Sequence, residues 1–516
     1  MLPDFGMIHC ALAPVDFPPF RFLADLLTSP TVPSLMNSSQ LTNRVAVIGG
    51  GITGLAAAHR LTELSPGAEV TLYEQGDRPG GILQTVERDG FLIERSADMF
   101  TSRDPWAVDL CTRIGFQDQL ISTNEQHRRA LVVRGGRLYP VPRGWSLLSP
   151  TSVFSVMTSR LLSIRGRLRV AWEYFKPGRT SGEDESLASF ARRRLGREAY
   201  EQIIQPLVGG IFTADPEKLS MAATLPQFLA MEEDCGSLIR GGKRASRKHG
   251  HAMAGGARYG QFLAPRKGLS SLVDAIAARV PGTSIRCGHR VNQLAAIPEG
   301  GWKLELSTPT GDQQADVDHV ILATSAGGAA QLTSSFHPSL AAQLSEITSA
   351  SAAVVSLGYR REQISHPLDA FGLVVPLVEK RPLIAVSFSS LKFPGRAPDG
   401  HLLLRVFIGG ACQPELLEQS DDRLLETAIS QLEQLVGAQG EPVLSEVARW
   451  KKTMPQYHVG HLDRVSQIES TINEIPGLEL AGNAYHGVGI PACIHAGEAA
   501  AERITGEAGE PNGGGG

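Results

Sequence analysis

The sequence is poor in cysteine, and none of its cysteines forms a recognisable metal or redox motif. The six residues are widely spaced and include no C-x-x-C pair: Cys10, Cys111, Cys235, Cys287, Cys412 and Cys493. This spacing predicts neither a zinc site nor a disulfide framework. We therefore expect a reducing, cytoplasmic compartment and a protein without a bound metal.

Long apolar runs and an excess of charge are also missing. No uninterrupted apolar run reaches the roughly 18 to 20 residues that a membrane-spanning helix needs, which excludes such a helix but leaves attachment to a membrane surface open. The 49 basic and 53 acidic side chains give a net charge of −4, whereas nucleic-acid-binding proteins are normally strongly basic. We expect no nucleic-acid partner.

The 516 residues are enough for two or three domains, with irregular segments at both ends. Residues 1–43 contain six prolines and no periodic pattern, so a disordered or loosely attached extension is expected there. Translation that starts at Met36 and a targeting segment both remain open as explanations of this extension. A flexible tail is expected over residues 508–516.

The first chemically informative feature is a glycine-rich turn between a predicted strand and a predicted helix. Residues 44–48 (RVAVI) are a short β-branched run, and residues 55–64 have the composition of a helix. The pattern Gly49-x-Gly51-x-x-Gly54, with Ile52 and Thr53 inside it, permits a tight turn, close approach of a pyrophosphate and close packing of helix on strand. The free N–H groups of the helix would face the phosphates.

An acidic residue stands where a nucleotide-binding domain holds a ribose. The second predicted strand, residues 69–73, ends at Glu74, which is 20 residues beyond Gly54 and is followed by Gln75. A carboxylate at this place would accept hydrogen bonds from the ribose, and it disfavours a 2′-phosphate. FAD or NAD is therefore expected, and NADP is not.

A second glycine pair, Arg78-Pro79-Gly80-Gly81, follows directly and separates FAD from NAD better than the first turn does. The run from Val47 to Gly81 resembles the large flavoprotein family of amine oxidases, carotenoid desaturases and protoporphyrinogen oxidases. In that family the second glycine pair approaches the FAD phosphates, and an arginine such as Arg78 lies near the diphosphate. The resemblance implies a noncovalently bound FAD, since no cysteine lies in an obvious attachment context.

Motifs farther along the chain resemble the protoporphyrinogen and coproporphyrinogen oxidases within this family. They are residues 207–216 (LVGGIFTADP) with Leu219-Ser220, residues 264–269 (APRKGL), residues 455–461 (PQYHVGH) and residues 482–494 (GNAYHGVGIPACI). Several separate motifs in one order, within residues 44–505, are specific evidence, whereas the first glycine turn alone would be weak.

The last motif is another strand, glycine loop and helix, formed by a strand over residues 478–481 and a helix that ends near residue 504. The start of this helix would stabilise negative charge on the reduced flavin. The FAD contacts expected here are Gly482, Val488, Gly489, Ile490 and Ile494.

The resemblance implies an α/β plus α+β fold of interleaved domains. A Rossmann-like FAD-binding domain is expected from residues 44–90, 266–330 and 463–507, with further strands at residues 284–286, 302–306 and 319–323. In this domain Val291 would meet the adenine through its backbone, although ordinary sheet packing is an equal alternative. A mixed-sheet substrate domain is expected from residues 91–130, 241–265 and 331–462.

A helical, membrane-facing domain is expected from residues 131–240. Basic residues on apolar stretches, such as residues 159–170, fit contact with anionic lipid, and a solvated basic face is the alternative. The glycine-rich, basic residues 240–259 are expected to form a mobile surface loop.

The substrate pocket is expected to have apolar walls and cations at its rim, because a porphyrinogen is a flexible apolar ring with carboxylate side chains. Arg129, which opens a strand predicted over residues 129–133, resembles the family arginine that pairs with a propionate, and Arg128 is the neighbouring alternative. Core packing is the alternative role for the two phenylalanines of the lining. By resemblance, the cavity over the flavin is lined by Leu207, Gly210, Phe371, Gly372, Val374 and Phe407.

The implied reaction is the oxidation of protoporphyrinogen IX or coproporphyrinogen III to the porphyrin in haem biosynthesis. Flavin would take hydride from a meso carbon, and molecular oxygen would reoxidise the flavin and leave as peroxide. Asp98 is the one polar side chain that the family pattern puts near the reacting face.

The expected partners are the porphyrinogen and oxygen, while membrane contact, handover to the next haem-pathway enzyme and a homodimer stay open. Two alternative functions remain. One is another amine oxidase-type oxidase or desaturase, and the other is a non-catalytic porphyrin carrier.

Overall fold

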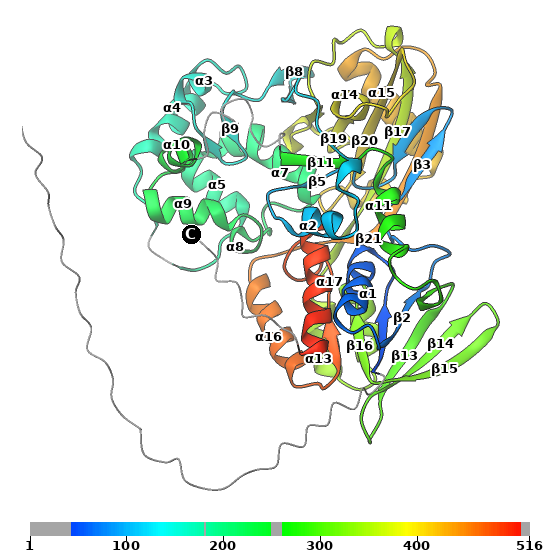
Figure 1. The fold of residues 1–516 in the computed structure, drawn as a ribbon. Coiled ribbons are helices and arrows are strands. Elements are labelled where there is room, and N and C mark those ends of the chain that lie inside the picture. Colours follow the sequence, from blue (N-terminus) through cyan, green and yellow to red (C-terminus); the bar gives the residue numbers. More distant parts are fainter. Residues whose placement is uncertain (1–42, 180–181, 249–260, 507–516) are drawn as a thin grey trace, which may run out of the picture. The chain divides into compact units, whose positions relative to one another are not determined.

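In the computed structural model, which describes residues 43–179, 182–248 and 261–506, a parallel sheet gathers strands from both ends of the chain (Figure 1). The sheet order is β12-β2-β1-β16-β22, and all neighbouring strands are parallel. The strands are β1 (Arg44–Ile48), β2 (Glu69–Glu74), β12 (Ile285–Cys287), β16 (His319–Leu322) and β22 (Leu478–Leu480). Because the strands run the same way, the turns after them open at one edge.

Two helices from opposite ends of the sequence pack together beside this sheet. They are α1 (Ile52–Leu64) and α17 (Ile490–Thr505), blue and red in Figure 1. A Cβ at Gly497 of α17 would lie 2.2 Å from the Thr53 carbonyl oxygen of α1, so only glycine permits this approach. The strand, turn and helix predicted at each end of the chain are confirmed, although α1 begins at Ile52, earlier than the predicted residue 55.

A second, seven-stranded sheet is mixed. Its order is β21-β17-β20-β19-β18-β7-β8, and only the pairing of β18 with β7 is parallel. One face packs on helix α15 (Asp421–Val436) through fully apolar side chains. The strands are β7 (Ala130–Arg134), β8 (Arg137–Pro140), β17 (Ser349–Arg360), β18 (Gly372–Val374), β19 (Ala385–Phe388), β20 (His401–Gly409) and β21 (Leu444–Pro455).

Residues 153–248 are mainly helical, as the sequence predicts for this part of the chain. The helices are α3 (Val153–Met157), α4 (Ile164–Trp172), α5 (Leu187–Leu195), α6 (Arg197–Ala199), the π-helix η3 (Tyr200–Ile204), α7 (Gln205–Phe212), α8 (Met221–Thr224), α9 (Pro226–Cys235) and α10 (Leu238–Lys248). The expected boundary at residue 131 is wrong, because strands β7 and β8 belong to the seven-stranded sheet. The strand predicted at residue 129 begins one residue later.

The predicted mobile loop over residues 240–259 is also wrong for residues 240–248, which lie in α10. The buried Glu173 carboxylate accepts from the Leu238 and Ile239 amides and so caps the start of this helix. A Cβ at Gly242 would lie 2.1 Å from the Ser149 hydroxyl, so this glycine serves close packing and not flexibility. Residues 249–260, the extension over residues 1–42 and the tail after residue 506 lie outside the described residues.

The remaining elements connect these layers. The strands are β3 (Thr85–Arg88), β4 (Phe91–Glu94), β5 (Phe100–Thr101), β6 (Leu120–Ser122), β9 (Trp145–Ser146), β10 (Ser149–Pro150), β11 (Phe262–Pro265), β13 (Arg290–Ala296), β14 (Trp302–Thr308) and β15 (Gly311–Val317). The helices are α2 (Trp106–Arg113), α11 (Leu269–Ala277), α12 (Ala326–Thr333), α13 (Pro338–Ser345), α14 (Ser389–Lys392) and α16 (His461–Asn473). None of the helices in the described residues is long and apolar enough to cross a membrane.

The buried Glu94 joins β4 to the start of α11. Its carboxyl accepts from the Leu269 amide and from the Thr85 hydroxyl, both at 2.8 Å. Burial raises the pKa of Glu94 from 4.5 to about 7, although these two hydrogen bonds lower it. The stabilising contribution of the protonated form is therefore present below about pH 4.5 and is lost as the pH rises through about 7.

We predict that Glu94→Gln removes this pH dependence, because the amide keeps a neutral group of the same shape at every pH. Between about pH 5 and about pH 8 the wild type should lose roughly 1 to 3 kcal/mol of unfolding free energy relative to the variant. Urea unfolding of the apo-protein at several pH values measures this difference. Glu87→Gln, at an exposed carboxylate of β3, is the control, and equal pH profiles for the two variants would refute the prediction.

Candidate active site

The two N-terminal glycine turns meet at the carboxyl edge of the parallel sheet. The Gly80 amide donates to the Gly50 carbonyl at 2.7 Å, and Gly51 and Gly80 form an isolated parallel bridge. The Gly49 amide donates to the Tyr73 carbonyl at 2.8 Å, which anchors the first turn to β2. The two motifs that the sequence presents separately are therefore one continuous backbone surface.

The glycines of the first turn fall into two groups. A Cβ at Gly49 would lie 2.5 Å from the Ala323 carbonyl oxygen, and a Cβ at Gly54 would lie 1.9 Å from the Gly49 carbonyl oxygen. The fold itself therefore needs glycine at residues 49 and 54. A Cβ at Gly51, by contrast, would meet no atom within 4 Å, and φ there is an ordinary −66°. The space in front of Gly51 is open to a bound group.

The C-terminal loop repeats this arrangement. Gly489 precedes α17 as Gly51 precedes α1, and no side chain caps either helix. A Cβ at Gly489 would approach only the Pro491 ring, at 3.7 Å, so this residue also faces open space. Gly482 has φ of +142°, a region that glycine enters without strain.

Buried residues of the two helix starts follow these glycines. Ile52, Thr53, Ile490 and Ile494 are buried, and Ile494 is fully enclosed in the core between the helices. Their side chains pack in the protein interior, whereas Val488 is partly exposed. For Ile494 the expected contact with a ligand is thus limited to its backbone.

Glu74 lies at the end of β2 and binds the backbone of the first glycine turn and of Gly76, which precedes the second glycine turn. One carboxylate oxygen accepts from the Gly50 amide at 2.7 Å, and the other accepts from the Gly76 amide at 2.6 Å. A carboxylate offers about four acceptor positions, so two of them remain for the hydroxyl groups of a ribose. Gln75 is exposed beside it. The sequence assigned Glu74 a role toward a ligand, and the structure adds a role in shaping the loop.

Arg78 has a different set of partners from the expected diphosphate. Its guanidinium donates to the carbonyls of Pro79, Gly81 and Leu83 and so closes the second glycine turn. These bonds fix the loop in which Gly80 and Gly81 lie. The diphosphate role of Arg78 stays a prediction.

Val291 lies in β13, close in sequence to a contact with Glu74. Its side chain is buried in the core around Trp302 and Leu306. Two residues before it, the His289 amide donates to the Glu74 carbonyl at 2.9 Å. The side chain of Val291 therefore packs in the sheet core, and only its backbone remains for the expected adenine contact.

The seven-stranded sheet presents an accessible apolar strip on the face opposite α15. Val374 pairs with Ala385, and Ala385 pairs with Phe407, so these three side chains lie in a row on one face. All three are partly accessible, whereas Leu373 and Val386 on the opposite face are 1% exposed. One face of the sheet is thus sealed and the other borders open space.

Helix α7 lies over this strip. A Cβ at Gly210 would lie 3.7 Å from Val374 and 3.9 Å from Ala385, and Leu207 packs in the cluster that includes Val374. The structure therefore brings together Leu207, Gly210, Val374 and Phe407, with Gly372 on the same face. Phe371 is buried at 4% exposure, at the end of the same strand, as its alternative role in the core predicts.

Asp98 lies in a buried cluster of charges and not on an open surface. Lys392 Nζ is 2.8 Å and Arg405 Nη1 is 3.1 Å from the same Asp98 oxygen. Burial alone would raise the pKa of Asp98, but the charges of Lys392 and Arg405 lower it to about 2. Arg405 is two residues before Phe407 in β20, so the cluster lies on the face that carries the accessible strip.

Sequence reasoning missed both cations of this cluster. Lys392 ends a short helix and Arg405 lies inside an apolar strand, and neither belongs to a motif. The contacts join residues 294 or more positions apart. Arg405 could have been recognised from the sequence as a buried cation, because a basic residue in the middle of an apolar strand requires a buried partner.

Arg129 lies just before β7, in which Leu131 and Val133 pack in the core on the α15 side of the sheet. Its Nε donates to the Asp369 carbonyl at 2.7 Å, and its guanidinium forms an ion pair with the Asp369 carboxylate. Its backbone carbonyl accepts from the Phe371 amide. The alternative residue, Arg128, donates to the carbonyls of Thr123 and Asn124. Of the two, Arg129 lies next to the strand that carries Gly372 and Val374.

Comparison with known proteins assigns the family. The family model described as flavin containing amine oxidoreductase matches residues 52–505. The chain belongs to this family of flavin-containing oxidoreductases. Its cofactor is FAD, and the fold is the mixed α/β fold of this family.

Relatives of this flavoprotein match nearly all of its length. It is 33% identical to a coproporphyrinogen III oxidase of Bacillus subtilis, over 88% of this chain and 96% of the relative. It is 31% identical to a chloroplastic protoporphyrinogen oxidase of Nicotiana tabacum, over 89% of this chain and 85% of the relative. A structure from Exiguobacterium sp. 255-15, described provisionally as a protoporphyrinogen oxidase, has a TM-score of 0.80 at 31% identity and covers 90% of this chain and 99% of that one.

The residues of the flavoprotein fit FAD. Two uncapped helix starts at one sheet edge suit the diphosphate and the flavin carbonyl region, because free amides attract negative charge. The space in front of Gly51 and Gly489 is open, and a bound dinucleotide in this space would explain why both residues are glycine. Glu74 has acceptor positions left for the ribose.

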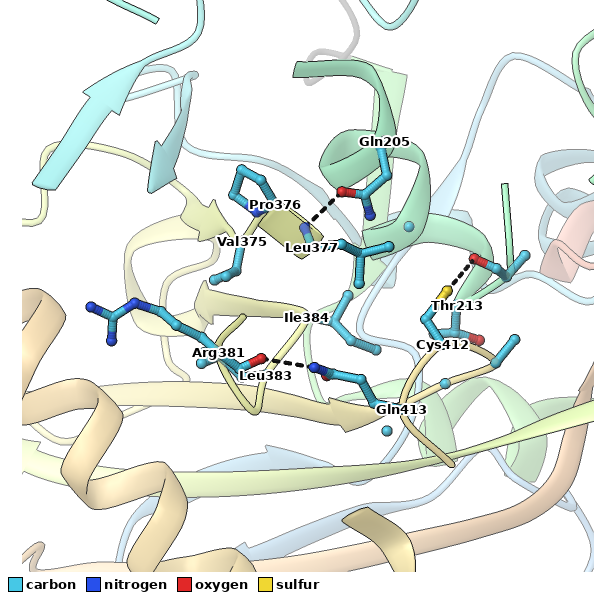
Figure 2. A pocket seen from close by; sticks show the side chains of 15 residues that line it. Gln205, Thr213, Val375, Pro376, Leu377, Arg381, Leu383, Ile384, Cys412 and Gln413 are labelled. Atoms are coloured by element: carbon cyan, nitrogen blue, oxygen red, sulfur yellow. Dashed lines mark hydrogen bonds between the residues drawn. The ribbon is translucent and has the colours of Figure 1, made fainter. Parts of the chain in front are cut away.

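A separate small hollow of about 20 Å³ lies beside the accessible strip and is shown in Figure 2. Its wall includes Gln205 and Gly209 of α7 and the loop of residues 409–413. Gln205 accepts from the Leu377 amide at 2.9 Å, which ties α7 to the loop after β18. No sequence motif indicated this hollow, because its wall comes from three separate segments of the chain.

We predict that Gly51→Val yields a folded protein that does not bind FAD. The Cβ of a valine at residue 51 meets no protein atom within 4 Å, so the thermal midpoint of the apo-protein should stay close to that of the wild type, whereas the side chain would occupy the space of the diphosphate. Purification followed by measurement of bound flavin per chain tests this outcome. Gly67→Val is the matched control, since a Cβ there also meets nothing within 4 Å but lies away from both glycine turns. Full flavin content in Gly51→Val would contradict the proposed geometry.

Proposed function

We propose that this flavoprotein oxidises a porphyrinogen, either protoporphyrinogen IX or coproporphyrinogen III, to the porphyrin in haem biosynthesis, with molecular oxygen as electron acceptor. Relatives named for these two reactions match most of the chain at 31 to 33% identity. The observation in the structure that carries the proposal is the partly accessible row of Val374, Ala385 and Phe407 beneath Gly210. A broad apolar face with a glycine above it suits a flat, apolar macrocycle.

We propose that the two sheets bind different molecules. We assign FAD binding to the parallel sheet with residues 44–90, 266–330 and 463–507, and substrate binding to the seven-stranded sheet with α7. Bound FAD supplies the hydride acceptor. The protein holds the apolar ring in one orientation and excludes water from it, which favours hydride transfer because the reacting atoms stay aligned.

The Asp98 cluster supplies fixed positive charge on the substrate side. Lys392 and Arg405 share one carboxylate, so the three groups together carry a net charge of +1 when all are ionised. In a buried site such a charge favours negative charge that develops nearby. Asp98 thus orients the two cations and does not exchange a proton, since its pKa of about 2 keeps it ionised.

Arg129 is the proposed anchor for a propionate. Its ion pair with Asp369 is partly exposed, so a substrate carboxylate can replace Asp369 at small cost. This contact is remote from the reacting carbon and would act on ground and transition states alike, so it affects KM more than kcat.

The proposed activity is tested by assaying both porphyrinogens side by side and following the porphyrin fluorescence under air. We expect wild type to oxidise at least one of them with one peroxide released per hydride transferred, and Arg129→Ala to raise KM about threefold to thirtyfold with little change in kcat. Arg128→Ala is the matched control. The absence of turnover with both substrates in FAD-loaded protein would refute the proposed function.

We also propose that the protein attaches to the surface of anionic membranes. Ile164, Leu168 and Trp172 lie on one side of α4 at intervals of four residues, and all are more than half exposed. Phe154 and Phe175 nearby are 79% and 71% exposed. Basic side chains border this patch, since Arg240 and Lys243 of α10 lie over the Tyr174 ring. An apolar stripe with basic neighbours is typical of helices that lie in a lipid interface.

We predict that Leu168→Ser with Trp172→Ser lowers binding to phosphatidylglycerol vesicles at least tenfold. Each exposed side chain that enters the lipid contributes roughly 1.5 to 3 kcal/mol, and both are removed. Vesicle sedimentation measures the bound fraction, with phosphatidylcholine vesicles to test the dependence on charge. Val443→Ser, an exposed apolar residue outside the patch, is the control. Equal partitioning of the wild type and the double variant would exclude this attachment surface.

A further inference from the structure

The PQYHVGH motif forms a turn behind the C-terminal glycine loop. Residues 455–461 connect the end of β21 to the start of α16. Tyr457 and His461 are 3% and 1% exposed, and their rings stack with centroids 3.9 Å apart and planes 12° apart. The two polar aromatic side chains therefore form one buried pair.

Both rings bind the backbone of the loop that precedes α17. The Tyr457 hydroxyl donates to the Asn483 carbonyl at 2.7 Å, and His461 Nε2 lies 2.8 Å from the Tyr485 carbonyl oxygen. Because a carbonyl only accepts, this nitrogen of His461 carries a proton and donates it. The pair thus holds backbone carbonyls at two positions of the loop, residues 483 and 485.

The loop needs such external partners. Residues 481–489 contain neither helix nor strand before α17 begins, so their backbone groups lack the regular pairing of secondary structure. Burial lowers the pKa of His461 and raises that of Tyr457, so both side chains stay uncharged near neutral pH. Their hydrogen bonds to the loop are therefore constant over the pH range in which most enzymes work.

The opposite side of the same turn is bound to the segment after α7. The Ser220 amide donates to the Tyr457 carbonyl at 2.8 Å, and the Val459 amide donates to the Lys218 carbonyl at 2.9 Å. Asp184 accepts from the Ser220 hydroxyl at 2.6 Å and from the Gly460 amide at 3.4 Å. Residues 218–220 follow the helix that carries Leu207 and Gly210.

We propose that Tyr457 and His461 are positioning residues that hold residues 483–487 in the shape that receives FAD, and that their turn links this shape to the segment after α7. Both side chains are buried and bind loop carbonyls, so they act through the loop backbone. The inference rests on the proposed FAD contacts of residues 482–490. It gives a role to two motifs, residues 455–461 and Leu219-Ser220, that the reaction itself does not use.

The test is titration of apo-protein with FAD, measured by the quenching of flavin fluorescence, together with the thermal midpoint of each apo-variant. Tyr457→Phe and His461→Leu should raise the FAD dissociation constant about fivefold to fiftyfold, because each leaves a loop carbonyl without its donor. His461→Gln should bind within about twofold of wild type, since its amide can still donate to the Tyr485 carbonyl.

Tyr359→Phe is the matched control. Tyr359 is fully buried in the seven-stranded sheet, and its hydroxyl has no hydrogen-bond partner among the described residues. This variant should leave FAD affinity unchanged, whatever it does to the thermal midpoint. A dissociation constant within twofold of wild type for both Tyr457→Phe and His461→Leu would overturn the positioning role.

Gly489→Val separates this inference from the proposed FAD site. If Gly489→Val weakens FAD binding and the two turn variants do not, the loop binds FAD but the turn does not position it. If Gly489→Val binds FAD normally, the loop is not an FAD contact and the inference fails together with the proposed site.

The link to α7 is tested by Asp184→Ala. Asp184 makes no contact with residues 483–487, yet it holds both Ser220 and Gly460. The linked turn predicts a severalfold weaker binding of FAD in this variant. Unchanged affinity would show that the turn holds the loop without help from the segment after α7.

Discussion

The close packing of α1 on α17 is the constraint on which the rest of the structure depends. These helices begin more than 400 residues apart, yet Gly497 lets them approach until a Cβ would overlap the Thr53 carbonyl. Because each helix follows a strand of one parallel sheet, their uncapped starts open at the same edge. The proposed FAD site therefore combines the starts of α1 and α17, which lie far apart in the sequence.

The seven-stranded sheet shows a second asymmetry, between its two faces. The face toward α15 is sealed by apolar side chains, whereas the face toward α7 contains both an accessible apolar row and a buried cluster of charges. Buried cations are costly without partners, and Asp98 neutralises only one of the two that contact it. Retention of the second positive charge beside an apolar strip fits chemistry in which negative charge develops on a bound group.

Local patterns in the sequence were enough to predict the nucleotide-binding elements. Strands β1, β2, β16 and β22 and the glycine turns after them follow from short β-branched runs and spaced glycines. Contacts between distant residues could not be predicted in this way: the cations that bind Asp98 and the carbonyls that bind Tyr457 come from other parts of the chain. The glycines of α10 suggested a flexible loop in the sequence. In the structure they allow close packing on Ser149, and Glu173 caps the helix, and neither of these tertiary contacts can be seen from the local sequence.

The most direct measurement is anaerobic mixing of the FAD-loaded protein with each porphyrinogen while the visible absorbance of the bound flavin is recorded. We expect that at least one porphyrinogen bleaches the flavin within the time of a single turnover, and that admitted oxygen restores the colour with release of peroxide. A flavin that keeps its colour in the presence of both porphyrinogens would contradict the assignment of the accessible strip as the site of porphyrinogen oxidation.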